Sequence, residues 1–106
     1  MRVFREIEVA ELFNMLEENE QEIKLIDIRE TAEFDRGAIP GAENIPVRLL
    51  PEKISQLDRD QIHVFYCQVG IRSAQICAWF MERGFAHVHN LRGGIHAWTH
   101  SGLRVA

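Results

Sequence analysis

Short apolar runs alternate with helix-like segments along nearly the whole chain, and this alternation limits the possible folds more than any other feature of the sequence. The runs lie at residues 23–28, 61–66 and 85–91, and they contain isoleucine, valine and aromatic residues typical of strands. Segments of helical period separate them. Because consecutive strands joined through helices run parallel, the sequence predicts an α/β domain with a mostly parallel sheet covered by helices on both faces.

The segments between and after these runs carry helix signals. We expect helices within residues 7–19, 48–57, 73–84 and 92–102, and a helical turn from Thr31 to Asp35. In the third helix, Ser73 is the expected N-cap and Gly84 the expected stop. Glycines and prolines break regular structure in residues 37–46, where we expect a shaped loop with a brief strand from Ala42 to Ile45.

The length and charge of the chain restrict its class and its partners. With 106 residues the chain can bury one core, so we expect a single domain over residues 1–106. The formal net charge of −4 gives no general attraction to nucleic acid or to an anionic membrane, and neither is an expected partner. No apolar stretch approaches the roughly 18–20 residues that span a bilayer. The first residues carry no secretory signal, so we expect a cytoplasmic protein.

The two cysteines of the chain have different surroundings. Two are too few for a disulfide scaffold, and neither forms a metal-ligand pair with another cysteine or with histidine. His87 and His89 fit a half-exposed strand face, so we expect no metal and no other cofactor. Cys77 lies among apolar residues of a predicted helix and is expected to pack in the core. A bridge between Cys77 and Cys67 is disfavoured because it would consume a reactive thiol.

Cys67 directly follows an apolar strand and precedes a predicted helix, in the stretch YCQVGIRSA at residues 66–74. Such a loop can curl so that its backbone N–H groups point to its centre; those groups belong to Gln68, Val69, Gly70, Ile71, Arg72 and Ser73. The helix dipole and the Arg72 guanidinium add positive charge, and Gly70 allows a turn that a side chain can forbid. These effects lower the pKa of a thiol below its usual value of about 8.5. More of the sulfur is then in the thiolate form, which is the nucleophilic form.

This interpretation sets two conditions on Cys67: the sulfur is ionised near neutral pH, and it is open to solvent. The alternative is a buried cysteine that acts as a small apolar residue beside an ordinary turn. The strand, Gly70, Arg72, Ser73 and the following helix all fit an anion-binding loop. This agreement favours the interpretation of Cys67 as a nucleophile. Asp27 to Arg29 and Arg92 to Gly94 also lie at or beyond the carboxyl ends of predicted strands. Parallel sheets bind ligands there, so three segments are expected to meet at one site.

Four segments, in this order, resemble those of the rhodanese-like sulfurtransferases in their single-domain form. They are LIDIRE at 25–30, GAIPGAENIP at 37–46, CQVGIRS at 67–73 and LRGGIHAW at 91–98. The resemblance covers about residues 5–101. It implies a five-stranded, mostly parallel sheet flanked by helices. It also implies that Cys67 accepts a sulfane sulfur as a persulfide and passes it on.

The implied activity moves sulfur from a donor such as thiosulfate to cyanide or a thiol. The N–H groups of the loop would stabilise the terminal sulfur anion on Cys67. Arg72 either attracts the anionic donor or braces the loop by pairing with a carboxylate. Asp27 and Arg29 match family positions that orient the loops, and we expect them to be supporting residues. Gln68 stands where enzymes that use thiosulfate well often carry a basic residue.

Two other functions are compatible with a cysteine loop of this kind. One is a sulfur-relay module that takes persulfide from a protein partner, such as a cysteine desulfurase, or works with a thioredoxin-like protein. The other is a phosphatase or an arsenate reductase. Those enzymes have a loop one residue longer than the six residues from Cys67 to Arg72, and the phosphatases typically have histidine where Tyr66 stands. Both differences disfavour phosphatase chemistry.

Overall fold

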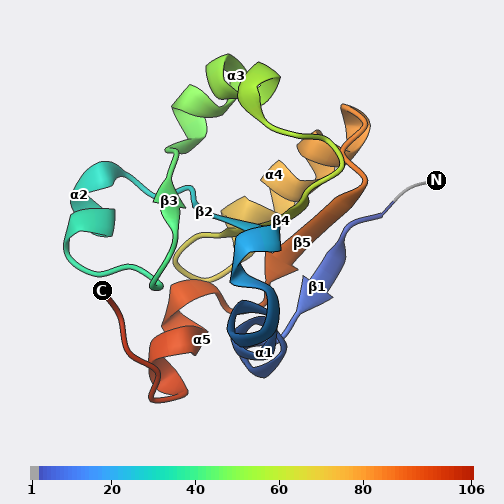
Figure 1. The fold of residues 1–106 in the computed structure, drawn as a ribbon. Helices are drawn as coiled ribbons and strands as arrows, with labels where there is room; N and C mark the ends of the chain where they lie inside the picture. Colours follow the sequence, from blue (N-terminus) through green and yellow to red (C-terminus); the bar gives the residue numbers. More distant parts are fainter. Residues whose placement is uncertain (1–2) are drawn as a thin grey trace.

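The computed structural model describes residues 3–106 and contains a five-stranded sheet in which all neighbouring strands run parallel (Figure 1). The strands are β1 (Arg5–Ile7), β2 (Ile23–Asp27), β3 (Glu43–Asn44), β4 (Ile62–Tyr66) and β5 (His87–Leu91). Their order is β1-β5-β4-β2-β3, so β4 lies at the centre. The predicted α/β class is confirmed, and the sheet is parallel throughout.

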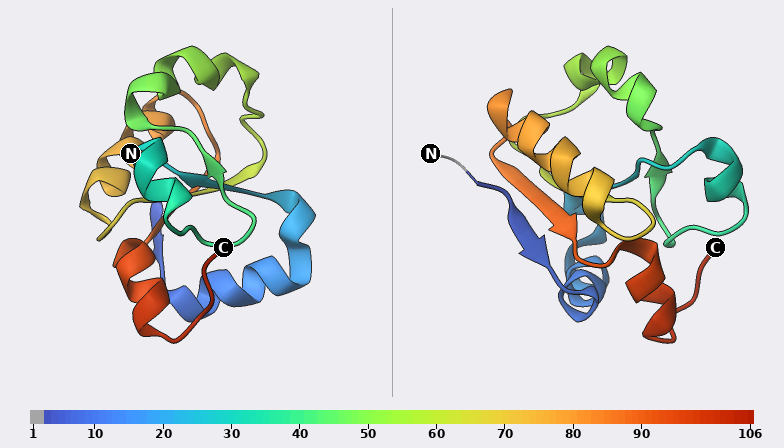
Figure 2. Two further views of the ribbon diagram at one scale, coloured as in Figure 1. Left: turned by 90° about the vertical axis from the view of Figure 1, so that its left-hand side faces the viewer. Right: turned by 180° about the vertical axis from the view of Figure 1, so that it is seen from behind.

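Helices cover both faces of this sheet. They are α1 (Val9–Asn19), α2 (Thr31–Asp35), α3 (Leu50–Lys53), α4 (Ile71–Glu82) and α5 (Gly94–His100), with the short 3₁₀ helices η1 (Glu20–Glu22), η2 (Val47–Leu49) and η3 (Ile54–Gln56). Figures 1 and 2 show α1 and α5 on one side of the sheet and α3 and α4 on the other. Within residues 3–106, no helix is long and apolar enough to cross a membrane.

Two strands differ from the sequence pattern. No strand is expected at residues 5–7, because the charged Arg5 and Glu6 interrupt any apolar run and Ile7 falls within the helix expected over residues 7–19. This segment becomes β1 because it pairs with β5, in a register that sets Glu6 beside Asn90. The strand expected from Ala42 to Ile45 is reduced to Glu43–Asn44.

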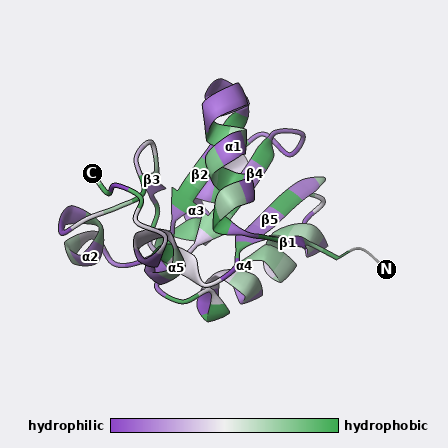
Figure 3. Ribbon diagram, turned by 90° about the horizontal axis from the view of Figure 1, so that it is seen from below, coloured by the Kyte–Doolittle hydropathy of each residue, from purple (hydrophilic) through white to green (hydrophobic). Residues whose placement is uncertain are grey.

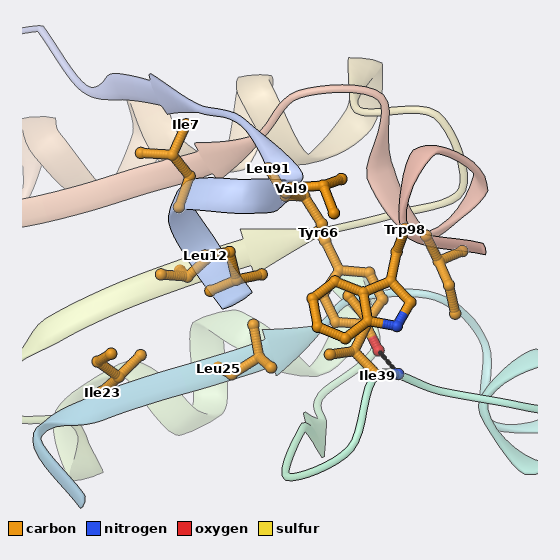
Figure 4. Close-up of a cluster of buried hydrophobic side chains, with 11 residues drawn as sticks. Ile7, Val9, Leu12, Ile23, Leu25, Ile39, Tyr66, Leu91 and Trp98 are labelled. Atoms are coloured by element: carbon orange, nitrogen blue, oxygen red, sulfur yellow. Dashed lines mark hydrogen bonds between the residues drawn. The ribbon is translucent and has the colours of Figure 1, made fainter. Parts of the chain in front are cut away.

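Alternate residues of the strands point to opposite faces, so the sheet builds two cores. The core under α1 and α5 (Figure 4) includes Leu12, Leu25, Val64, Tyr66, Leu91 and Trp98. The core under α3 and α4 includes Ile26, Phe65, Cys67, Cys77, Phe80 and Val88. Figure 3 shows hydrophobic residues along the central strands and hydrophilic residues at the outer end of α1. Cys67 therefore lies on the α4 side of the sheet.

His63 is a buried titratable group outside the cysteine loop. It is 0% exposed and lies against the rings of Phe65 and Phe85. Its Nδ1 lies 2.9 Å from the carbonyl oxygen of Gln61, whereas its Nε2 has no hydrogen-bond partner among the described residues. Burial lowers the pKa of His63 below its ordinary value.

We expect the free energy of unfolding to fall as the pH drops below about 6.5, because the unfolded chain binds a proton at His63 before the folded chain does. Replacing His63 with phenylalanine should weaken this dependence. Urea unfolding at pH 5 and at pH 7.5 measures the difference. Part of the slope should remain, since burial also lowers the pKa of His89. An unchanged slope in His63→Phe would contradict the prediction.

Candidate functional site

The loop that carries Cys67 joins the end of β4 to the start of α4. Strand β4 ends at Tyr66, and α4 begins at Ile71 with Gly70 as its N-cap. Gly70 has φ +94°, in the left-handed region, so the backbone turns sharply into the helix at this residue. The prediction of Ser73 as N-cap is wrong, because the turn at Gly70 starts the helix earlier. Ser73 is instead buried in the first turn of α4.

The loop curls around the Sγ atom of Cys67. The backbone N–H of Gly70 donates a hydrogen bond to Sγ at 3.2 Å, and the backbone N–H of Ser73 donates another at 3.4 Å. The hydroxyl oxygen of Ser73 lies 3.4 Å from the same sulfur. The first turn of α4 thus directs N–H groups at a single sulfur atom, an arrangement that favours negative charge.

Opposing effects act on the pKa of the Cys67 thiol. Burial raises it, and hydrogen bonds from the side chain and backbone of Ser73 and from the backbone of Gly70 and Val69 lower it. The lowering is larger, so the pKa lies below its ordinary value. Cys77 is the opposite case, because burial in the core raises the pKa of its thiol. The environment therefore favours a thiolate at Cys67 and a neutral thiol at Cys77.

The sulfur of Cys67 is not open to solvent, and the expectation of access is wrong for this conformation. Only 1% of the residue is exposed. The physical reason is that the groups which hold the sulfur also enclose it. Gln68 and Val69, in contrast, are exposed at the turn of the loop. A molecule that reacts with the sulfur therefore needs the enclosing groups to move.

Helix α5 supports the loop from the other side. The backbone N–H of Ile95 donates to the carbonyl oxygen of Cys67, and that of His96 donates to the carbonyl oxygen of Gln68, both at 3.0 Å. This close approach requires glycine at position 94, where φ is +61°. A Cβ atom there would collide with the Cys67 carbonyl oxygen and would lie 2.6 Å from that of Gln68. The predicted meeting of the glycine turn with the cysteine loop is confirmed.

Replacing Gly94 with alanine is expected to reduce the free energy of unfolding by about 2–4 kcal/mol, through overpacking and left-handed strain together. Gly102→Ala is the matched control, because Gly102 has φ +81° but no atom within 4 Å of a Cβ. It should show only the strain, about 1–2 kcal/mol. Urea unfolding measures both. Equal losses in the two variants would contradict the packing argument.

The side chains of the loop's exposed residues surround the site without touching the sulfur. Val69 is 50% exposed and Ile71 is 67% exposed, which places apolar surface near the thiol. Arg72 is also exposed, and it forms no ion pair with any other of residues 3–106. The bracing role predicted for Arg72 therefore has no carboxylate partner among those residues.

Asp27 and Arg29 form a buried ion pair at the end of β2. The Arg29 Nη2 donates to Asp27 Oδ2 at 2.8 Å, and its Nε lies 3.1 Å from both carboxylate oxygens. Nη2 also donates to the carbonyl oxygen of Gly37 at 2.8 Å. In the same region, the Ile39 N–H donates to the Tyr66 hydroxyl at 3.1 Å (Figure 4). The ion pair therefore links β2 to the loop before β3 and makes its hydrogen bonds away from Sγ.

Asn90, near the carboxyl end of β5, belongs to the site although the sequence analysis did not select it. It is 1% exposed. The Ser73 hydroxyl donates to Asn90 Oδ1 at 2.5 Å, and Asn90 Nδ2 donates to the carbonyl oxygen of Gly70 at 3.1 Å. Nδ2 also donates to the Glu6 carboxylate oxygens at 3.0 and 3.1 Å. The sequence contains one signal that could have identified Asn90: it is a polar amide on a strand face that it shares with the apolar Val88.

Metal ligands are not grouped in the part of the chain that the structure describes. No group of three or more histidine, cysteine, aspartate or glutamate side chains there could hold a metal ion. Cys67 and Cys77 are both free thiols.

The parallel sheet and the cysteine in the loop before a helix define a class of α/β proteins in which backbone N–H groups hold a cysteine thiolate. Residues 8–101 match the family described as Rhodanese-like domain. The chain belongs to this family, as its sequence motifs predicted.

Relatives and solved structures agree with this assignment. A sulfurtransferase of Allochromatium vinosum is 42% identical over 100 residues, which cover 94% of this chain and 92% of the relative. The thiosulfate sulfurtransferase GlpE of Shewanella oneidensis is 35% identical over 98 residues, covering 92% of this chain and 95% of the relative. The crystal structure of a rhodanese-related protein from Thermoplasma volcanium has a TM-score of 0.87 at 30% identity and covers 97% of this chain and 98% of its own. These similarities support a sulfurtransferase role.

Proposed function

We propose that this chain moves a sulfane sulfur from an anionic donor such as thiosulfate to cyanide or a thiol, through a persulfide on Cys67. The observation that carries the proposal is the pair of N–H donors from Gly70 and Ser73 on Sγ, at 3.2 and 3.4 Å. They favour the thiolate, which is the attacking form. Similarity to a protein named thiosulfate sulfurtransferase supports this donor class.

The reaction consists of two exchanges at sulfur. In the first, the Cys67 thiolate attacks the outer sulfur of thiosulfate, the S–S bond of thiosulfate breaks, and sulfite leaves with the electron pair. The product is a persulfide anion on Sγ. In the second, cyanide attacks the outer sulfur, thiocyanate forms, and Sγ returns as a thiolate. Neither exchange transfers a proton, so no acid or base residue is required.

The dimensions of the loop favour sulfur over phosphate as the transferred group. Its N–H donors contact Sγ itself rather than a space beyond it. A loop of six residues from Cys67 to Arg72 suits one added sulfur better than a tetrahedral oxyanion. Because Cys67 is 1% exposed, the cycle includes an outward movement of the loop around Gln68 and Val69.

Arg72 is expected to attract the anionic donor. Replacing Arg72 with glutamine should raise the KM for thiosulfate by about tenfold, the effect of losing one charge-assisted contact. The free energy of unfolding should hardly change, since Arg72 forms no ion pair within residues 3–106. Lys53→Gln, which removes one exposed charge on α3, controls for net charge. A loss of stability with unchanged KM would instead identify a bracing role.

Mass spectrometry of the intact protein tests the persulfide directly. Thiosulfate should add about 32 Da, the mass of one sulfur, and peptide mapping should place it on Cys67. Cyanide should remove the added mass and release an equal amount of thiocyanate. Addition of sulfur at Cys77 instead, or thiocyanate formation without any added mass, would contradict the proposal.

A sulfur-relay function is the second candidate. Gln68 replaces a basic residue beside Cys67, and the exposed Val69 and Ile71 offer apolar contact area for a protein surface. A cysteine desulfurase or a thioredoxin-like protein would then be the partner. Uptake of persulfide sulfur from a desulfurase, together with a thiosulfate rate near background, would favour the relay. A thiosulfate rate well above background would favour the enzyme.

A further inference from the structure

We propose that Asn90 is a positioning residue that withholds the Ser73 hydroxyl proton from the Cys67 sulfur and so limits how strongly the loop holds the thiolate. The inference deepens the proposed function, since it concerns the nucleophile of that sulfur transfer. It rests on a conflict between two contacts of one hydroxyl group. Ser73 Oγ lies 3.4 Å from Sγ and 2.5 Å from Asn90 Oδ1.

A hydroxyl group has a single proton, so Ser73 can donate to only one of these atoms at a time. In the favoured orientation the shorter contact, to Asn90 Oδ1, takes the proton, and Oγ faces Sγ with a lone pair, which suits a neutral thiol and does not suit a thiolate. The hydroxyl lowers the pKa of Cys67 only in the other orientation, in which it donates to Sγ. A thiolate gains the hydroxyl as a further donor only when the hydroxyl turns away from Asn90.

The orientation of the Asn90 amide is fixed by its other contacts. Nδ2 donates to the Gly70 carbonyl oxygen at 3.1 Å and to both carboxylate oxygens of Glu6, at 3.0 and 3.1 Å. A flipped amide would turn its oxygen toward a carbonyl and a carboxylate, so the flip is strongly disfavoured. Glu6 and Asn90 are paired in the β1–β5 register, which keeps the carboxylate beside the amide.

The titratable and charged side chains around the sulfur do not replace the Ser73 hydroxyl as its donor. Cys77 belongs to the same core as Cys67, and burial raises the pKa of its thiol, so it stays neutral. The Glu6 carboxylate on β1 is bound to the Asn90 amide. Arg72 on α4 is exposed. Among residues 3–106, the Ser73 hydroxyl is the donor to Sγ that can turn, because the others are backbone N–H groups.

The arrangement has a chemical consequence for sulfur exchange. The nucleophilicity of a thiolate falls as its pKa falls, and the best attacking thiol has a pKa near the ambient pH. A loop that offered all of its donors to Sγ would stabilise the thiolate at the expense of attack. By engaging the Ser73 hydroxyl, Asn90 leaves the sulfur with its backbone N–H donors and holds the hydroxyl in reserve.

The thiolate absorbance near 240 nm, titrated against pH, tests this role without any sulfur donor. Asn90→Leu, a change of similar shape, should free the hydroxyl for Sγ and lower the pKa of Cys67 by about one unit. In a Ser73→Ala background, the same change should have no effect. Asn90→Ala provides the same comparison if the leucine variant does not fold. Cys67→Ser supplies the baseline for subtraction.

Val88→Ala is the matched control, because it loosens the same face of β5 two residues earlier without a hydrogen bond to Ser73. It should leave the pKa of Cys67 unchanged, with circular dichroism confirming the fold of every variant. An equal shift with and without the Ser73 hydroxyl would overturn the proposal, as would an unchanged or raised pKa in both Asn90 variants. Because no substrate is used, these outcomes are independent of whether Cys67 forms a persulfide.

Discussion

Replacing Cys67 with serine is expected to reduce thiocyanate formation from thiosulfate and cyanide by at least about a thousandfold, to the uncatalysed background. A serine hydroxyl stays protonated near neutral pH and cannot accept a sulfane sulfur as a persulfide. The side chain is of similar size, and Gly70 and Ser73 can still donate to its oxygen, so the fold should be retained. Steady-state measurement of thiocyanate, with circular dichroism on the same samples, gives the result.

Cys77→Ala is the control for loss of a thiol as such. Cys77 is buried in the core under α4, and its thiol is held neutral, so activity should stay within about twofold. The variant should lose about 1 kcal/mol of stability from the small cavity. If Cys67→Ser retained a tenth of the activity, the persulfide mechanism would be wrong. If Cys77→Ala were as inactive while folded, the second thiol would take part.

Breaking the ion pair between Asp27 and Arg29 is expected to cost the most stability of any single change considered. Their side chains are 0% and 6% exposed, so Arg29→Met leaves a carboxylate buried without its partner. Such a loss costs about 3–5 kcal/mol. It also releases the Gly37 carbonyl oxygen, which Arg29 binds at 2.8 Å. Urea unfolding at neutral pH measures the change in the free energy of unfolding.

Two further variants show whether burial is the cause. The double variant Asp27→Leu with Arg29→Met removes both charges and should recover most of the loss, because apolar residues need no partner. The exposed pair of Arg5 and Glu11, with side chains 64% and 42% exposed, is the surface counterpart. Arg5→Met should cost less than about 1 kcal/mol. A similar cost at both pairs would contradict the argument from burial.

The order of helices and strands was predictable because its signals are local. The apolar runs at 23–28 and 61–66 became β2 and β4, and helical periodicity located α1 and α4. Strand β1 was missed because its exposed residues have no apolar pattern. That segment is a strand only through its hydrogen bonds to β5, which lies more than 80 residues further along the chain.

The cysteine loop was predictable to the same extent and for the same reason. Tyr66, Cys67, Gly70 and the start of α4 are contiguous, so the sharp turn and the N–H donors could be inferred from residue types alone. The prediction of Ser73 as the N-cap was wrong, because a serine near the start of a helix is the residue type expected at an N-cap. In the folded protein its hydroxyl bonds to Asn90, 17 positions away.

The sequence by itself determined the fold class, the family and the cysteine at which chemistry is proposed, because each depends on local patterns and on their order along the chain. Tertiary structure alone decided that the sulfur is enclosed, since Cys67 is part of the buried core under α3 and α4. It also decided which group competes with that sulfur for the Ser73 hydroxyl proton. Glu6 and Asn90 are 84 positions apart, and only the pairing of β1 with β5 brings a carboxylate to the amide that binds Ser73.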